Sequence, residues 1–460
     1  MITVLLKQKK AVLIVLFFLT INAYSQDGIL DNYIQLACKN SIVLQQKNIS
    51  LEKAMYALKT AQSLYQPTIA FQGGYQTGEG GRAISIPVGD LMNPVYSTLN
   101  QLTASNKFPQ ISNSESYFLP HNFYDVKLTT TVPIYNKDLA YNKQIQSQQY
   151  DLQKTDIDTY KRELVKNIKI AYFNYLLATE ASVIYQNTLL LANEGKRTNE
   201  RLLANGKGLP AYVLRSESEV QNATAQLNDA QKQASNARLY FNFLLSRNLD
   251  EAIVTNFQAE TLLKNILQLS NEDVSIAKRE ELKMLQQSVE LNKTVLKMNQ
   301  SFWYPKVSGF LNEGSQAVDF TVNKKSLYYI GGVQIDIPIF TGKRNVYKIK
   351  QSELDIQYAN KSLELTQQQL SFSANIVKND LSKYIINYYA SQKQLDAAAS
   401  YQRLLDKGFR EGVNTFIETL DARNQFTNAQ LLVVMNQYKV LIAAANLERE
   451  TATFNLSTIK

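Results

Sequence analysis

The sequence predicts a mainly α-helical protein in which long antiparallel helices adjoin four membrane-spanning strands. Three observations lead to this fold class. Residues 124–132 alternate between two faces, residues 138–205 contain no proline, and the landmarks of the first half of the chain return in the second. Alternation with a period of two marks a strand with one apolar and one polar face. A continuous helix over 138–205 would be ~100 Å long, so the helices are expected to build a rod or a tube.

The composition favours long elements. The chain of 460 residues contains 17 Gly and 9 Pro, so residues that interrupt helices and strands are scarce. The formal net charge of +9 would also suit a scaffold that binds nucleic acid, but the lysines are dispersed along the chain rather than grouped, so we expect no nucleic-acid partner. Cys38 is the only cysteine, which excludes an internal disulfide. Lipid attachment to Cys38 is the weaker alternative, because Gln35 stands where an aliphatic residue is expected.

Residues 1–25 have the features of a signal peptide that is removed on export. Three lysines between positions 7 and 10 precede an apolar run at 11–21, and residues 23–25 form a small-x-small cleavage site. A membrane anchor is the alternative, and the apolar run is short for it. The mature chain is therefore expected outside the cytoplasm.

Residues 26–271 are expected to form a first structural repeat. Pro67 ends its first helix, and Pro133 should end its second strand because proline has no N–H to donate to a neighbouring strand. The expected ranges are helix 28–66, strand 68–76, a long extracellular loop 77–122, strand 124–132, helix 138–205, reversal 205–210, helix 211–245 and connector 246–271.

Residues 272–460 are expected to repeat this plan. A helix–proline–strand junction at Pro305 matches the one at Pro67, and a reversal at Gly412 matches the one at Gly206. Landmarks of different kinds that recur in one order indicate an internal duplication. The expected ranges are helix 272–304, strands about 306–312 and 328–337 joined by a short loop, and a reversal at 408–414.

Each half contributes two strands of the length that crosses a bilayer at a tilt, about 9–11 residues. Four strands do not close a barrel, and an open edge in lipid leaves backbone groups unpaired at a cost of several kcal/mol each. Three copies would supply twelve strands, an even number that closes. Aromatic residues near both strand ends, such as Tyr124 and Phe340, fit two interfacial girdles. The side chains expected to face outer-membrane lipid are Val126, Leu128, Val132, Val333, Ile335 and Ile337.

The ordered motifs resemble the TolC family of outer-membrane efflux proteins. The chain contains two helix–Pro–strand junctions, SLYQPTIAFQ and SFWYPKVSGF, and two strand–Pro–Ile–aromatic turns, VPIYNKD and IPIFTGK. The reversal EGVNTFIETLDARNQ and the openings IQLACKN and REEL add to the likeness. The resemblance implies a homotrimer with a twelve-stranded barrel and a helical periplasmic tunnel. A periplasmic adaptor protein and an inner-membrane transporter would be its partners.

The resemblance also implies where the tunnel narrows and where it docks. An acidic ring at the periplasmic tip would be formed by Glu418 and Asp421, which share a helix face because they are three residues apart. Asn414 stands where an Arg that links neighbouring helices is familiar in the family, so the latch of the tip differs. The tips expected to meet the adaptor contain Asn205, Gly206, Gly208, Pro210, Gly412 and Asn414.

No catalytic or cofactor site is expected. His121 is the only histidine, and the adjacent Glu280 and Glu281 diverge on a helix, so neither a histidine triad nor a paired-carboxylate site is predicted. We expect no cofactor and no metal. The main expectation is the exit channel of a tripartite efflux system. A duct for type I protein secretion and a stand-alone porin-like channel remain alternatives, and the sequence does not specify the cargo.

Overall fold

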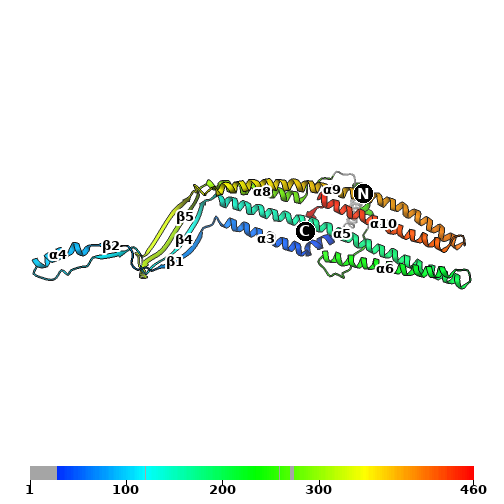
Figure 1. The fold of residues 1–460 in the computed structure, drawn as a ribbon, viewed down its shortest axis with the longest axis horizontal. Coiled ribbons are helices and arrows are strands. Elements are labelled where there is room, and N and C mark those ends of the chain that lie inside the picture. Colours follow the sequence, from blue (N-terminus) through cyan, green and yellow to red (C-terminus); the bar gives the residue numbers. More distant parts are fainter. Residues whose placement is uncertain (1–27, 120, 258, 270–273, 460) are drawn as a thin grey trace, which may run out of the picture. The chain divides into compact units, whose positions relative to one another are not determined.

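The computed structural model describes residues 28–119, 121–257, 259–269 and 274–459. The expected signal peptide at 1–25, residues 258, 270 and 271 of the expected connector, and residues 272 and 273 of the following expected helix lie outside this description. The chain divides into two compact units (Figure 1). Unit 1 comprises 1–54, 148–292 and 355–460, and unit 2 comprises 55–147 and 293–354. Among the described helices, none combines the length and the apolar character that a bilayer crossing requires.

Unit 1 is built from long helices and from parts of helices that continue into unit 2. The longest is α5, a helix of 68 residues, and α9 has 67 residues. Both lack proline, which is why the hydrogen-bond ladder continues unbroken. The described helices that lie wholly or partly in unit 1 are α2 (Gly28–Asn40), α3 (Ile42–Ser63), α5 (Lys137–Ala204), α6 (Pro210–Leu244), α7 (Ala259–Leu269), α8 (Glu280–Gln300), α9 (Arg344–Arg410) and α10 (Phe416–Thr451). Unit 1 also contains the short 3₁₀ turn η2 (Leu456–Thr458), and unit 2 contains η1 (Ser301–Trp303).

Aromatic side chains form the centre of the unit 1 core. Tyr33 of α2 meets Phe241 of α6 edge to face, with ring centroids 5.0 Å apart. Tyr172 of α5 is fully buried, and its hydroxyl donates to the carbonyl oxygen of Val254 at 2.8 Å. The buried phenol thus has the hydrogen-bond partner that its polar tip requires. These contacts join α2 to the hairpin of α5 and α6.

A buried ion cluster joins α8 to the end of α10. The Arg279 Nε donates to Glu281 at 3.0 Å, and Arg449 pairs with the same carboxylate. The Arg449 Nε also donates to Glu163 of α5 at 3.1 Å. Glu280 points to a different partner, Arg162, whose Nε lies 2.8 Å from it. The two adjacent glutamates therefore have separate partners, Arg162 for Glu280 and both Arg279 and Arg449 for Glu281, and they point apart as expected from their adjacent positions on a helix.

Unit 2 contains an antiparallel sheet of four strands in the order β1-β4-β5-β6. In this sheet Leu128 lies opposite Phe71 on one side and opposite Glu313 on the other. The range expected for the first strand, 68–76, coincides with β1. The strands are β1 (Thr68–Gln76), β4 (Phe123–Tyr135), β5 (Lys306–Val318) and β6 (Leu327–Asp336).

Three strand ends differ from the expectation. Strand β4 continues beyond Pro133 to Tyr135, because a register shift between these two residues accommodates the missing N–H. Strand β5 continues to Val318 rather than ending near 312, since it pairs with the whole length of β4. Strand β6 ends at Asp336, so Ile337 lies just outside the sheet.

The helix bounds also need correction. The expected helix 28–66 is two helices, because the chain breaks at Ser41, whose Oγ accepts the N–H of Leu44 at 3.2 Å and so caps α3. The helix expected over 272–304 begins at Glu280 and ends at Gln300, followed by a 3₁₀ turn.

The expectation that 77–122 is only a loop was wrong. The segment contains β2 (Ala83–Ile86) paired with β3 (Ser114–Tyr117), and between them lies the helix α4 (Val88–Leu102). The glycine, proline and asparagine residues of this segment suggested a loop. In the structure Gly89, Asn93 and Asn100 instead let the return segment pack closely against α4. We refer to residues 77–122 as the insertion.

Candidate functional site

The first reversal, between α5 and α6, is a glycine-terminated turn. Gly206 has a φ of +69°, a conformation that favours glycine. Its N–H donates to the Leu203 carbonyl at 3.0 Å, and the Lys207 N–H donates to the Leu202 carbonyl at 2.8 Å. This pair of bonds satisfies two carbonyls that the helix end would otherwise leave free.

The remaining residues of the first reversal fix its shape. Gly208 leaves no room for a side chain, because a Cβ there would lie 2.7 Å from the backbone nitrogen of Leu203. The Asn205 side-chain amide donates to the Arg201 carbonyl at 2.8 Å. Pro210 is the first residue of α6, where a missing N–H costs no helical bond.

The second reversal, between α9 and α10, repeats this turn. Gly412 has a φ of +78°, its N–H donates to the Phe409 carbonyl at 3.2 Å, and the Val413 N–H donates to the Gly408 carbonyl at 2.8 Å. Asn414 then packs against Gly408, where a Cβ would lie 2.6 Å from the asparagine amide nitrogen. Both predicted tips therefore have the same backbone bonds in corresponding positions.

The two acidic residues of the expected ring are both exposed, and one of them caps a helix. A Glu418 carboxylate oxygen accepts the Thr415 N–H at 2.7 Å, and the Glu418 N–H donates to the Thr415 Oγ at 3.3 Å. The hydrogen bond from the Thr415 backbone lowers the pKa of Glu418. Asp421, one turn further, accepts from the Gln425 amide at 2.7 Å. The pair thus lies in the first turns of α10, directly after the second reversal.

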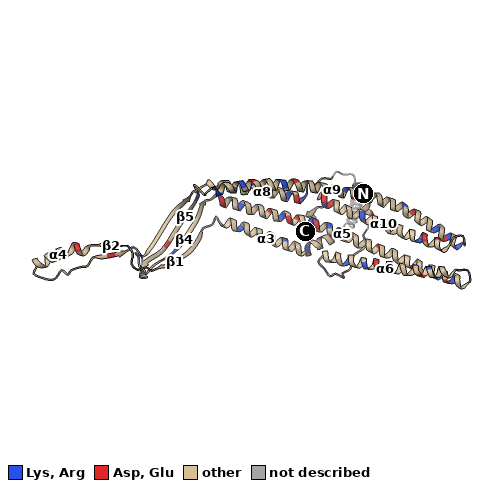
Figure 2. Cartoon of the chain, in the orientation of Figure 1, with Lys and Arg blue, Asp and Glu red and all other residues tan. Residues whose placement is uncertain are grey.

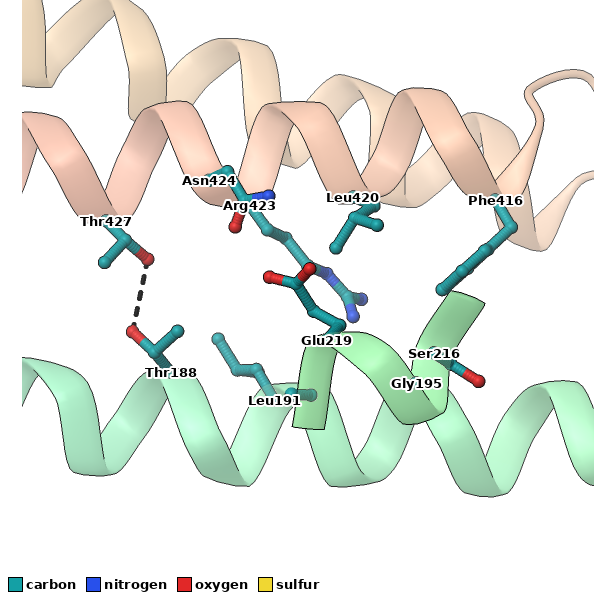
Figure 3. Close-up of a pocket in the computed structure, with 11 residues that line it drawn as sticks. Thr188, Leu191, Gly195, Ser216, Glu219, Phe416, Leu420, Arg423, Asn424 and Thr427 are labelled. Atoms are coloured by element: carbon teal, nitrogen blue, oxygen red, sulfur yellow. Dashed lines mark hydrogen bonds between the residues drawn. The ribbon is translucent and has the colours of Figure 1, made fainter. Parts of the chain in front are cut away.

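Beside the reversals, a small cavity lies where the hairpin of α5 and α6 meets α10 (Figure 3). It offers about 20 Å³, close to the space of one water molecule, so it does not hold a transported substrate. Thr188 of α5 and Thr427 of α10 share a hydrogen bond of 3.2 Å across it. The lining residues are Thr188, Leu191, Ala192, Gly195, Ser216, Glu219, Phe416, Leu420, Arg423, Asn424 and Thr427.

Two charged residues of this cavity were not predicted. Arg423 donates to Asp406 of α9 through Nε at 3.2 Å and through Nη2 at 2.9 Å, so it ties α10 to α9. Glu219 of α6 is 7% exposed and lines the same cavity as Arg423 (Figure 3). Arg423 gave no signal in the sequence because its partner lies on another helix, and Glu219 gave none because its pairing with Arg215 of the same helix is an ordinary i,i+4 spacing.

The sheet of unit 2 places most of the expected lipid-facing residues on one face. Residues directly opposite each other in a sheet share a face. Val132 lies opposite Gly309, and Gly309 lies opposite Val333, so the two valines face the same side. The same reasoning places Ile69, Phe71, Val126, Leu128, Leu311 and Ile335 on this apolar face.

The other face of the sheet is more polar, although Phe310 and Ile330 also lie on it. It carries Gln72, Lys127, Thr129, Asn312, Gln316, Gln334 and Asp336. On the apolar face Glu313 is the one charged residue among the paired positions, and Tyr329 and Leu128 lie opposite it. A sheet with one apolar and one polar face fits a wall between lipid and water.

Comparison with known proteins identifies the family. A family model described as "Outer membrane efflux protein" matches residues 33–245 and 273–453. The chain belongs to the outer membrane efflux protein family. The stretch between the two matched segments coincides with the expected connector.

A curated relative and several solved structures are also similar to this chain. The outer membrane protein TolC of Escherichia coli (strain K12) is 21% identical over 340 residues, which cover 68% of this chain and 66% of that protein. The CmeC outer membrane channel of Campylobacter jejuni superposes with a TM-score of 0.72 at 14% identity, covering 92% of this chain and 85% of that one. The open MtrE channel of Neisseria gonorrhoeae gives a TM-score of 0.71 at 16% identity, covering 92% and 88%. At 14% and 16% identity, these two solved structures show that the chain shares their fold.

Membership of the outer membrane efflux protein family defines the kind of protein. It is an outer-membrane efflux channel and not an enzyme. This confirms the resemblance drawn from the proline junctions and the reversals.

Proposed function

We propose that three copies of this chain form the outer-membrane exit duct of a tripartite efflux system. The strands would form a twelve-stranded barrel in the outer membrane, and the helices would continue it as a tunnel in the periplasm. A periplasmic adaptor protein and an inner-membrane transporter would deliver substrates and supply the energy.

The four-stranded sheet is the observation that carries this proposal. Among the described residues, β1 pairs only with β4 and β6 pairs only with β5, so each has one edge without a strand partner. Strand β1 has 9 residues and β6 has 10, so their lengths match. Because every neighbouring pair in the sheet is antiparallel, β6 of one copy and β1 of the next would also run antiparallel. Three copies would then close without an exposed edge in lipid.

The two reversals support docking of an adaptor. Apolar side chains stand exposed beside them, with 55% exposure for Leu209, 78% for Val413 and 47% for Ile417. Exposed apolar residues at a tip indicate a surface that another protein covers. Since both turns have the same backbone bonds, one kind of adaptor hairpin would fit both.

The proposal is tested by assembly, conduction and docking of the purified protein. We expect a trimer by light scattering in mild detergent, conductance in planar bilayers, and co-purification with an adaptor encoded beside the gene. Replacing Val413 by Asp should abolish the co-purification and leave the conductance unchanged. A monomer that does not conduct would refute the duct. Conducting trimers that bind no adaptor would support a porin-like channel, and dependence on an ATP-driven exporter of proteins would support type I secretion.

The acidic pair is tested through cation block of single channels. The variant Glu418→Gln keeps a side-chain oxygen that can cap α10, and it removes the charge. Together with Asp421→Asn it should weaken block by multivalent cations from the periplasmic side. Glu364→Gln, an exposed acid on α9, is the matched control. Block that is equal in the double variant, the control and the unmodified channel would exclude an acidic ring at these positions.

A further inference from the structure

The helix α4 of the insertion has one covered side and one uncovered apolar side. On the covered side Asn93 both donates to and accepts from the backbone of Ile111, at 2.9 Å each way. Asn100 bonds the backbone of Phe108 in the same manner, at 2.8 and 3.1 Å. Gly89 lets the chain approach closely, since a Cβ there would lie 2.4 Å from the Ile111 oxygen. We call residues 106–113, held in this way, the strap.

The uncovered side carries apolar residues at heptad spacing. Val88, Leu91, Val95 and Leu102 follow one another at steps of three, four and seven, with Thr98 completing the pattern. Their exposed fractions are 37% for Val88, 68% for Leu91, 50% for Val95 and 78% for Leu102. Alternating steps of three and four are the pattern of a coiled-coil seam. We call these five residues the α4 seam.

The strap and the seam occupy different sides of the helix. If Val88 is given heptad position a, then Asn93 and Asn100 both fall at f, the position farthest from the seam. Of the positions flanking the seam, Pro94 and Gln101 are exposed, and Met92 and Leu99 are partly buried. Pro94 lies inside the helix and has no N–H to donate, but the spacing of the seam continues beyond it.

We propose that the α4 seam packs against the same seam of two other copies of this chain, forming a three-helix cap beyond the sheet. The inference rests on the proposed trimer. The insertion joins β1 and β4 where Gln76 faces Phe123, so a threefold barrel would hold three inserted helices at one rim in parallel orientation. A coiled coil of about two heptads is weak in isolation, but attachment to one rim gives effective concentrations of about the millimolar range.

The charge of α4 favours another copy over a lipid surface as the partner. The helix contains one acidic residue, Asp90, and no Lys or Arg (Figure 2). Helices that lie on membranes are typically rich in Lys and Arg on their polar side. An uncharged seam is compatible with itself, because identical helices meet there without like charges facing each other.

Cysteine crosslinking of the full-length trimer tests the cap. In a Cys38→Ser background, Leu91→Cys lies on the seam and Ser97→Cys is an exposed control on the same helix. We expect oxidation of Leu91→Cys to give covalent dimers at least tenfold more abundant than those of Ser97→Cys. A bimane label on Leu91→Cys should be insensitive to nitroxide-labelled lipid.

Three other results would contradict the cap, and they can be told apart. Trimers that remain intact while both cysteines crosslink equally poorly would overturn the cap and leave the proposed duct standing. Quenching of the label by nitroxide lipid without crosslinking would assign the seam to the membrane surface and likewise overturn the cap. Absence of trimers in the unmodified protein would overturn the cap and the duct together.

Discussion

Arg449→Met is the substitution whose effect the structure defines most closely. The side chain of Arg449 is 7% exposed and pairs with Glu163 and Glu281, which are 38% and 20% exposed. Methionine keeps much of the volume and removes the charge, so it leaves two carboxylates facing a partly buried site without their shared cation.

The magnitude follows from the Glu281 carboxyl. Burial alone would raise its pKa, but hydrogen bonds from Arg279 and Arg449 outweigh this and lower it from 4.5 to about 2. A difference of that size corresponds to about 3 kcal/mol of folding free energy, which Arg279 and Arg449 supply together, so Arg449 accounts for part of it. Removing one member of a buried ion pair costs about 3–5 kcal/mol in other proteins. Since Glu281 keeps Arg279, we expect a loss of about 3 kcal/mol for Arg449→Met.

The pH dependence has a defined sign. Because the folded pKa of Glu281 is depressed, its contribution is complete above about pH 4.5 and is lost as the pH falls towards about 2. When the pH falls from about 4.5 to about 2, Arg449→Met should therefore lose less folding free energy than the unmodified protein, because its Glu281 contributes less to stability at pH 7.

Hydrogen exchange of the purified full-length protein measures the effect. Amides in α8 and in the last turns of α10 should open with a free energy lower by about 3 kcal/mol in Arg449→Met at pH 7. Lys361→Met is the control, because Lys361 and Glu364 form an exposed pair with 80% and 55% exposure. Equal exchange of these amides in the two variants would refute the assignment of stability to the buried cluster.

Three further substitutions test other parts of the molecule. Gly412→Ala, at a φ of +78°, should destabilise the second reversal by about 1–2 kcal/mol and speed exchange of the last turn of α9. Thr415→Ala removes the capping box and should cost about 0.5–2 kcal/mol at the start of α10, and unchanged exchange there would contradict this role. Val333→Lys should lower the yield of trimers, at a cost of about 2–4 kcal/mol if Val333 lies near the bilayer midplane, whereas Gln334→Lys on the opposite face should not. The reverse ranking would assign the apolar face to the lumen.

The features that the sequence predicts well are those encoded locally. A long run without proline gives α5, and glycine followed by a helix start gives both reversals, because each depends on the conformational range of single residues. Strand β1 is bounded by Pro67 and by the polar, glycine-rich stretch after Gln76. The division of β4 into two faces follows from its alternation.

The features that it predicts poorly depend on contacts between distant segments. The helix α4 depends on Asn93 and Asn100, whose amides bond a return segment that no local pattern reveals. Strand β5 extends to Val318 because it pairs with β4 along its whole length. The residues after 312 are polar, so the sequence alone does not predict that the strand continues there. The ion cluster of Arg279 and Arg449 draws on α5, α8 and α10, so its members look like ordinary surface charges in the sequence.

The attachment of the insertion makes it an exchangeable module. It leaves and rejoins the sheet through Gln76 and Phe123, which are direct cross-strand neighbours. Within the insertion, the side chains of Asn93 and Asn100 fix the return segment to the helix, together with the ring contact of Tyr96 and Phe108. A two-residue hairpin turn would be long enough to join the two ends, so related channels could lengthen, shorten or replace this segment without altering the register of the wall.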